Sequence, residues 1–195
     1  MSAPVIHFDL ATHTYRVGGR VIPSVTQIIG SAGVRGAFTP SDAVMAYACD
    51  RGRAVHLACE LDDDGTLDER SVHPEVLPYL NAYRQFKAET RYEIVEMELA
   101  RYDELMGFCG TPDRICVING RPAVLDLKSG VKMAATGMQL AAYAVLAGHP
   151  AASRFSLQLR ADGLYRLERY SNPADWPAFV AALTLHNWRV ANGLG

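Results

Sequence analysis

The pattern of apolar and polar positions predicts alternating β and α segments along the chain. Residues 5–9 and 14–22 alternate weakly, and Gly18-Gly19 fits the two-residue turn of a small N-terminal β-hairpin. Helical spacing, together with cap and stop signals such as Ser41 as an N-cap, predicts helices at residues 24–30, 41–61, 74–90, 133–148 and 173–191. Period-two alternation bounded by turn residues predicts strands at residues 95–99, 112–118, 121–128, 154–160 and 163–170.

The order of these elements indicates the fold class. After the hairpin and a short helix, two long helices precede three strands, and a helix, two strands and a last helix follow. This order predicts an α/β domain with a sheet flanked by helices, and the hairpins make that sheet mixed rather than parallel. With 195 residues, 49% of them hydrophobic and 21% charged, we expect one domain over residues 1–195 and exclude a disordered, collagen-like or disulfide-scaffold protein.

Charge and targeting signals narrow the function classes only slightly. The chain has 19 Lys and Arg against 21 Asp and Glu, so any nucleic-acid contact must come from a local basic patch. The N-terminus has no secretory pattern and no apolar stretch is long enough to span a membrane, so we expect a cytosolic protein without membrane contact. The cysteines match no metal-binding spacing, and we interpret them as reduced core thiols; they are Cys49, Cys59, Cys109 and Cys116.

The most informative segment is the apolar hairpin around Asn119-Gly120, because this dipeptide between two apolar runs is a strong turn signal. The turn fixes a register. It places Pro122 in a non-hydrogen-bonded pair, where a proline breaks no ladder bond, and it places Asp113 opposite Asp126. Two carboxylates in this position repel each other. The register therefore requires a compensating group, either a divalent cation or a shared proton.

Lys128 follows Asp126 by two residues and therefore projects from the same face of the strand. Carboxylates that hold Mg²⁺ beside a lysine suit phosphodiester hydrolysis, because the metal polarises a phosphoryl oxygen and activates water while the lysine orients or deprotonates that water. The alternative is a surface ion pair, since Asp-x-Lys also occurs by chance. The opposed Asp113 and the apolar residues around Asp126 favour the metal site.

Several motifs carry a resemblance to a known family. Thr111-Pro112-Asp113 followed by Leu125-Asp126-Leu127-Lys128 resembles the signature of the PD-(D/E)XK nucleases, and the surrounding pattern resembles their RecB-like and phage-exonuclease branch. The further matches, in order, are His13-x-Tyr15, Pro23-Ser24-Val25-Thr26, Arg51-Gly52-Arg53-Ala54-Val55-His56, Glu98, Gly107-Phe108-Cys109-Gly110 and Gln139-x3-Tyr143. The order of these pieces over residues 13–145, more than any one of them, makes the resemblance specific.

The resemblance implies a restriction-endonuclease-like core and one or two Mg²⁺ or Mn²⁺ ions. It implies that Asp113, Asp126 and Lys128 are catalytic, with Lys128 as the catalytic lysine. The metal ligands that it implies are His56, Asp113, Asp126 and the Leu127 carbonyl, with Glu98 as a weaker candidate acting through water. Gln139 and Tyr143 would contact the nucleic-acid backbone or support Lys128, and we add Arg53 as a substrate-binding candidate because it shares a helix face with His56.

Other interpretations of these residues stay open. Without the family pattern, His56 and Glu60 are better explained as a capping or surface pair, and the role of Glu60 is unassigned. Scattered basic residues are candidate phosphate contacts, although such charges are usually only solvated; they are Arg51, Arg53, Arg84, Lys87, Arg91, Arg114 and Lys132. The Asp62–Asp64 run is better explained as a helix terminus than as a metal site.

The sequence thus predicts a metal-dependent deoxyribonuclease, an exonuclease acting at DNA ends in phage recombination or repair. Because no cysteine follows Cys116, we expect no iron–sulfur cluster. Its partners would be DNA and a single-strand annealing or recombination protein, in the host cytoplasm if the chain is phage-encoded. The alternatives are a DNA-binding or partner-docking protein with little turnover and a hydrolase of small phosphoesters. Exonuclease versus endonuclease action, polarity, strand preference, sequence specificity, the natural metal and the oligomeric state stay open.

Overall fold

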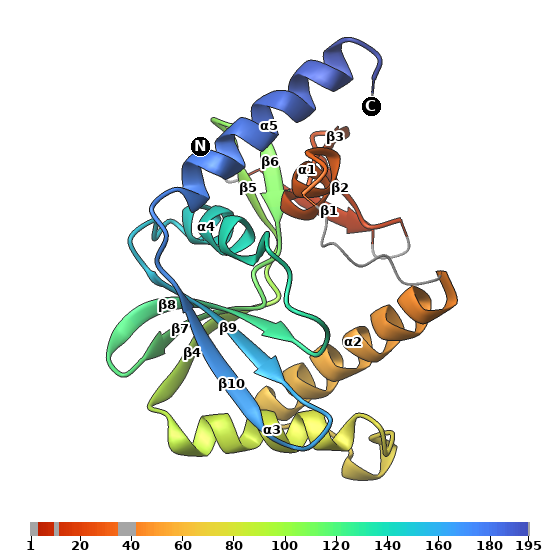
Figure 1. The fold of residues 1–195 in the computed structure, drawn as a ribbon, viewed down its shortest axis with the longest axis vertical. Helices are drawn as coiled ribbons and strands as arrows, with labels where there is room; N and C mark the ends of the chain where they lie inside the picture. The colour runs from red at the N-terminus through yellow and green to blue at the C-terminus, as the bar shows by residue number, and fades with distance from the viewer. Residues whose placement is uncertain (1–3, 10–11, 35–41, 195) are drawn as a thin grey trace.

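A five-stranded mixed sheet forms the centre of the protein (Figure 1). The computed structural model describes residues 4–9, 12–34 and 42–194. The strand order is β10-β9-β8-β7-β4; only β8 and β9 pair in parallel, and the other neighbours are antiparallel. The strands are β4 (Tyr92–Met97), β7 (Arg114–Ile118), β8 (Arg121–Lys128), β9 (Ser153–Leu159) and β10 (Tyr165–Tyr170). The predicted mixed sheet is confirmed.

Helices cover both faces of this sheet (Figure 1). On one face lie α2 (Asp42–Asp63) and α3 (Leu77–Glu89), and on the other lie α1 (Val25–Ser31), α4 (Thr136–Leu146) and α5 (Asp175–Ala191). The central strand β8 divides its side chains between the two cores, because successive residues of a strand point to opposite faces. Leu125 and Leu127 pack toward α2 and α3, whereas Val124 packs toward α4 and α5. Asp126 and Lys128 are two and four residues after Val124 and therefore point to the same face of the sheet as Val124.

Two small sheets complete the fold. The predicted N-terminal hairpin is confirmed at Gly18-Gly19, where β2 (Thr14–Val17) pairs with β3 (Arg20–Ile22). A further strand, β1 (Ile6–Asp9), extends it to three strands. The pair of β5 (Arg101–Asp103) and β6 (Phe108–Gly110) was not predicted, because three-residue strands carry almost no periodicity.

Several element boundaries differ from the predictions. The helix expected from residue 74 begins at Leu77, because the backbone N–H groups of Val76 and Leu77 both bond to the His73 carbonyl in a preceding turn and Pro78 takes the first helical turn. A short 3₁₀ helix, Glu69–Ser71, precedes this turn. The expected N-cap Ser41 lies outside the described residues.

The cysteine prediction is confirmed for three residues and wrong for one. Cys59, Cys109 and Cys116 are buried thiols, whereas Cys49 is exposed on α2. Within the described ranges, the structure has no helix with the length and apolarity needed to cross a lipid bilayer.

Candidate active site

The β7–β8 hairpin carries the centre of the site. Asn119-Gly120 forms its turn with positive φ at both residues, as a type I′ turn requires. The ladder runs from the turn to Arg114 opposite Leu125, which is the predicted register. Asp113 lies one residue beyond the last ladder pair, where the same register would place it opposite Asp126. Both aspartates are buried; Asp126 is 1% exposed.

Each of the two aspartates has its own compensating partner. Asp113 Oδ2 accepts a hydrogen bond from the backbone N–H of Leu127 at 2.6 Å. Asp126 Oδ2 lies 2.8 Å from Lys128 Nζ. The expectation that only a cation or a shared proton would compensate the pair was too narrow, because a backbone amide and a lysine already contribute. Opposite charges and donated hydrogen bonds both stabilise a carboxylate.

Glu98 and His56 join Asp113 from two other elements. His56 Nδ1, on α2, lies 3.7 Å from Asp113 Oδ2 and 3.9 Å from Glu98 Oε1. The ligand atoms of these three residues all lie within 4.8 Å of one another. Glu98 reaches this place just after β4, where a register shift between Ile94 and Glu96 and a positive φ of 48° at Glu98 turn the chain. Glu98 therefore lies in the cluster itself, next to His56 and Asp113, whereas we expected it to act only through water.

Lys128 points to the side of the sheet that α4 covers, the same side as Asp126, and α4 supports it. Its ammonium donates to Gln139 Oε1 at 3.3 Å, and Gln139 Nε2 donates to Tyr143 Oη at 3.2 Å. Tyr143 is only 6% exposed. Of the two roles predicted for Gln139 and Tyr143, these contacts favour support of Lys128 over direct contact with a nucleic acid.

Two glycines explain part of the predicted motif Gly107-Phe108-Cys109-Gly110, which precedes Asp113. A Cβ at Gly110 would lie 2.9 Å from Tyr143 Cε1 and 2.9 Å from Leu146 Cδ1. Gly107 adopts a φ of 72°, in the left-handed region that favours glycine. The motif therefore lets β6 pass directly against the helix that supports the lysine.

The electrostatics of the cluster follow from burial and mutual proximity. Burial opposes a charged His56, but the carboxylates of Asp113 and Glu98 outweigh it and raise the pKa of His56 to about 9. Burial raises the pKa of Asp113, and it raises the pKa of Asp126 to about 6 despite the nearby Lys128. Burial opposes the charge of Lys128, yet Asp126 and Asp113 raise its pKa. The raised pKa values favour the cationic forms of His56 and Lys128 beside this group of carboxylates.

A buried arginine, Arg114, anchors this cluster from behind. Its guanidinium is fully buried and donates from Nε to Asp63 Oδ2 at 3.0 Å, from Nη1 to Glu98 Oε1 at 3.2 Å and from Nη1 to the Asp113 carbonyl at 2.7 Å. Asp63, at the end of α2, also accepts from Lys87. The expectation that Arg114 and Lys87 contact phosphate was wrong, because both are committed to buried or half-buried ion pairs. One signal was available: an arginine inside an otherwise apolar strand.

Two predicted residues lie outside this constellation. The Arg53 side chain is 78% exposed and ion-paired with Asp50 at 2.8 Å, so the structure does not bring Arg53 to the cluster. Glu60 is half-buried on α2, and burial together with the charge of Glu98 raises its pKa. No hydrogen bond or ion pair joins Glu60 to His56, so the alternative His56–Glu60 pair is not formed. The Leu127 carbonyl does face His56, whose Nε2 lies 3.0 Å away.

The donor set fits a hard divalent cation. Glu98, Asp113 and His56 offer converging ligand atoms, and the Leu127 carbonyl lies 3.0 Å from His56. These are oxygen-rich ligands of the kind that Mg²⁺ and Mn²⁺ accept. The expected ligand Asp126 is not among the three residues whose ligand atoms converge, although the register places it next to Asp113. Asp126 Oδ2 is buried and has no partner with good hydrogen-bond geometry, although Lys128 lies beside it. A carboxylate oxygen has more than one acceptor position, so Asp126 Oδ2 can accept a further ligand beside its ion pair with Lys128.

Comparison with known proteins agrees with this geometry. None of the curated proteins compared with the chain matches it. The model of the PD-(D/E)XK nuclease superfamily matches residues 50–183, a stretch that runs from α2, which bears His56, through the β7–β8 hairpin and α4 into α5. The match covers more than half of the chain and includes every residue of the cluster described above, so the chain belongs to the PD-(D/E)XK nuclease superfamily.

Proposed function

We propose that the protein is a metal-dependent deoxyribonuclease of the RecB-like and phage-exonuclease branch, formed by a single domain over residues 1–195. Membership of the superfamily makes it a nuclease that uses divalent metal. The observation that carries the proposal is the convergence of His56, Glu98 and Asp113 on the end of β8, where Asp126 and Lys128 lie.

The residues divide into a metal-holding group and a lysine on its support. Asp113, Asp126, Glu98, His56 and the Leu127 carbonyl would hold one or two Mg²⁺ or Mn²⁺ ions. Bound there, the metal would polarise a phosphoryl oxygen of the DNA backbone and lower the pKa of the attacking water.

Lys128 positions that water and offers a positive charge to the phosphoryl group as negative charge develops on it. Gln139 orients the ammonium by accepting its hydrogen bond, and Tyr143 fixes the amide of Gln139. The carboxylate of Asp126 keeps the lysine within reach of the metal-holding group.

The test is loss of end-labelled DNA in Mg²⁺ or Mn²⁺, compared between the wild type, Lys128→Ala and Arg70→Ala. The Arg70 side chain is 92% exposed and is not one of the residues assigned to the site, so its variant controls for the removal of a positive charge. We expect wild type and Arg70→Ala to degrade DNA, Lys128→Ala to lose at least about a hundredfold in rate, and chelation with EDTA to abolish cleavage. Equal cleavage by wild type and Lys128→Ala would refute the assigned role.

The choice of DNA separates the finer alternatives. An exonuclease degrades linear duplex and spares a covalently closed circle of the same sequence, whereas an endonuclease cuts both. DNA binding without metal-dependent loss would favour a DNA-binding or recombination-partner docking role. Turnover of a chromogenic phosphodiester without DNA loss would favour a hydrolase of small phosphoesters.

A further inference from the structure

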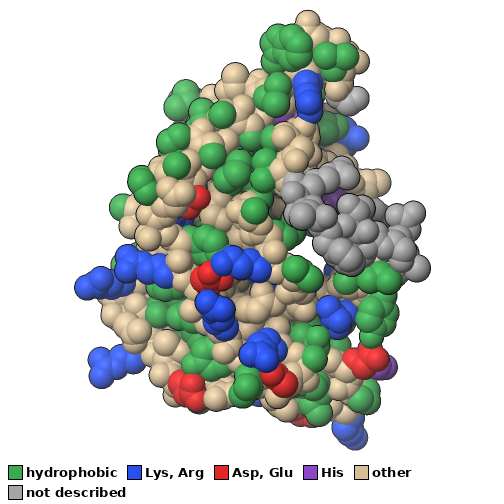
Figure 2. Space-filling model, viewed as in Figure 1, with side chains coloured by type: hydrophobic (Ala, Val, Ile, Leu, Met, Phe, Trp, Pro, Cys, Tyr) green, Lys and Arg blue, Asp and Glu red, His purple; other side chains and the backbone are tan. Residues whose placement is uncertain are grey.

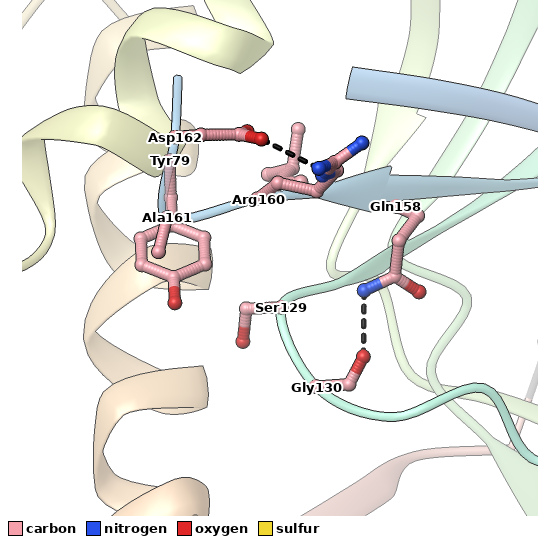
Figure 3. A pocket seen from close by; sticks show the side chains of 8 residues that line it. Tyr79, Ser129, Gly130, Gln158, Arg160, Ala161 and Asp162 are labelled. Atoms are coloured by element: carbon pink, nitrogen blue, oxygen red, sulfur yellow. Dashed lines mark hydrogen bonds and ion pairs between the residues drawn. The ribbon is translucent and has the colours of Figure 1, made fainter. Parts of the chain in front are cut away.

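A groove opens beside the end of β8, between α3, which bears Tyr79, and the end of β9 with the turn that follows it. It has a volume of about 410 Å³, and its lining includes Tyr79, Ser129, Gly130, Gln158 and Arg160. Figure 3 shows Tyr79 and Gln158 on its two sides, with Ser129 between them. We call this space the β8-end groove. Its lining is rich in hydrogen-bond donors, although the amide of Gln158 is used by the Gly130 carbonyl at 2.6 Å.

Arg51 of α2 contacts two of the residues that line the β8-end groove, Ser129 and Tyr79. Its Nη2 donates to the Ser129 carbonyl at 3.2 Å, and its guanidinium carbon lies 5.5 Å from the centre of the Tyr79 ring. Arg51 Nε is buried and has no hydrogen-bond partner. Among the described residues Arg51 has no carboxylate partner, so its positive charge is available to an anion.

Most other candidate phosphate contacts are neutralised. Figure 2 shows Lys and Arg side chains spread over this face of the molecule, several of them next to Asp or Glu side chains. Lys132 pairs with Glu168, and Arg160 at the groove pairs with Asp162 at 2.6 Å. Among the described members of this candidate set, only Arg51 and Arg91 have no carboxylate ion pair, and of these two Arg51 contacts a residue that lines the groove.

Arg51 lies close to the candidate metal site, next to the chain that leaves β8. His56 contacts the Leu127 carbonyl and Arg51 contacts the Ser129 carbonyl, two residues further along the chain and one residue past the end of β8. Two residues of chain span at most roughly 7 Å. This is about the length of one nucleotide unit along a DNA backbone, so a phosphate at the metal site would have its neighbour near Arg51.

We propose that Arg51 and the β8-end groove bind the DNA phosphate adjacent to the one that is cleaved. This inference rests on the proposed function and names the part of the substrate that the groove takes. Arg51 is then a binding residue that sets the position of the strand, with Tyr79 holding the guanidinium by cation–π contact. The polar groove walls would accommodate the sugar and phosphate that follow.

The experiment measures DNA affinity against salt in the Lys128→Ala background, so that DNA stays intact in Mn²⁺. Each neutralised phosphate contributes about −0.9 to the slope of log K against log salt for duplex DNA, which makes one contact worth roughly eightfold in affinity near 0.1 M salt. We expect Arg51→Gln to reduce the slope by about that one unit and Arg51→Lys to retain it. Arg70→Gln, which removes an exposed and paired arginine, is the matched control with an unchanged slope.

Three outcomes would overturn the inference: an unchanged slope in Arg51→Gln, a loss of affinity that does not depend on salt, or a larger slope change in Arg53→Gln. Thermal unfolding checks that Arg51→Gln is folded. If it is not, Arg51→Met replaces it, because the apolar methionine side chain keeps the contact with the Tyr79 ring. Wild-type cleavage with an unchanged Arg51→Gln slope rejects only this inference. Absence of both cleavage and DNA binding in wild type rejects the proposed function itself.

Discussion

Replacement of the buried Arg114 by methionine should destabilise the protein strongly. The guanidinium is fully buried, ion-paired with Asp63, which is itself 1% exposed, and hydrogen-bonded to Glu98 and the Asp113 carbonyl. Removal of one member of a buried ion pair leaves the other charge uncompensated and costs about 3–5 kcal/mol. Asp63 keeps the Lys87 ammonium at 2.8 Å and the Tyr83 hydroxyl at 2.7 Å, which favours the lower end, about 3 kcal/mol.

Urea unfolding followed by circular dichroism measures this loss. Because small domains have free energies of unfolding of about 5–15 kcal/mol, Arg114→Met should remain folded in buffer. The double variant Arg114→Met/Asp63→Asn removes both charges. We therefore expect its loss of unfolding free energy to be smaller than the sum of the two single losses by about 1–3 kcal/mol. The surface variant Arg70→Met should change stability by less than about 0.5 kcal/mol.

A loss below about 1 kcal/mol in Arg114→Met, or strict additivity in the double variant, would refute the reasoning that the arginine compensates a buried charge. Mn²⁺ affinity gives a second measurement. Since Arg114 holds Glu98 in the cluster, its removal should weaken Mn²⁺ binding, and this effect should vanish in a Glu98→Gln background.

Three further predictions concern packing, protons and thiols. Gly110→Ala should lower the free energy of unfolding by about 1–3 kcal/mol, because the added Cβ would lie 2.9 Å from Tyr143. Gly30→Ala, whose added Cβ would have no atom within 4 Å, should be neutral or stabilising. Urea unfolding compares the two variants, and equal effects would contradict the steric argument. Burial raises the pKa of Asp126 to about 6, so protons compete with metal there in addition to the proton on His56. Mn²⁺ affinity in calorimetry should therefore fall more steeply with pH below about 6 than above it, and an unchanged slope there would argue against Asp126 as a ligand. Cys49 should react rapidly with a maleimide and the other three cysteines only after denaturation, as mass spectrometry would show; rapid labelling of more than one thiol in the native protein would contradict the burial.

The sequence predicts best what local chemistry determines. The Asn119-Gly120 turn fixes the β7–β8 register because its two residues readily adopt positive φ and admit one pairing. Alternation along β8 then places Asp126 and Lys128 on one face and Leu127 on the other. These steps need no knowledge of the rest of the chain, and the structure agrees with each of them.

Contacts between distant segments were beyond this reasoning. Glu98 and Arg114 meet because a bulge in β4 and a positive φ at Glu98 turn its side chain inward, and neither feature has a sequence signal of its own. The pairing of Arg114 with Asp63 depends on where α2 ends against the sheet. Residue type indicated Glu98 and Arg114 as charged; only tertiary packing decides that one enters the cluster and the other is buried behind it.

The compensation of the two hairpin aspartates shows how such packing changes a chemical conclusion. From the hairpin alone, the repulsion of Asp113 and Asp126 required an added cation or proton. In the folded chain, Leu127 N–H, Lys128 and a His56 whose pKa is raised to about 9 supply positive charge or donated hydrogen bonds to the same carboxylates. A divalent cation must therefore displace a proton from His56 and compete with Lys128, so metal binding should release protons near neutral pH. The case for a metal site rests on the converging ligands, since the repulsion that first suggested the site is already relieved by the protein.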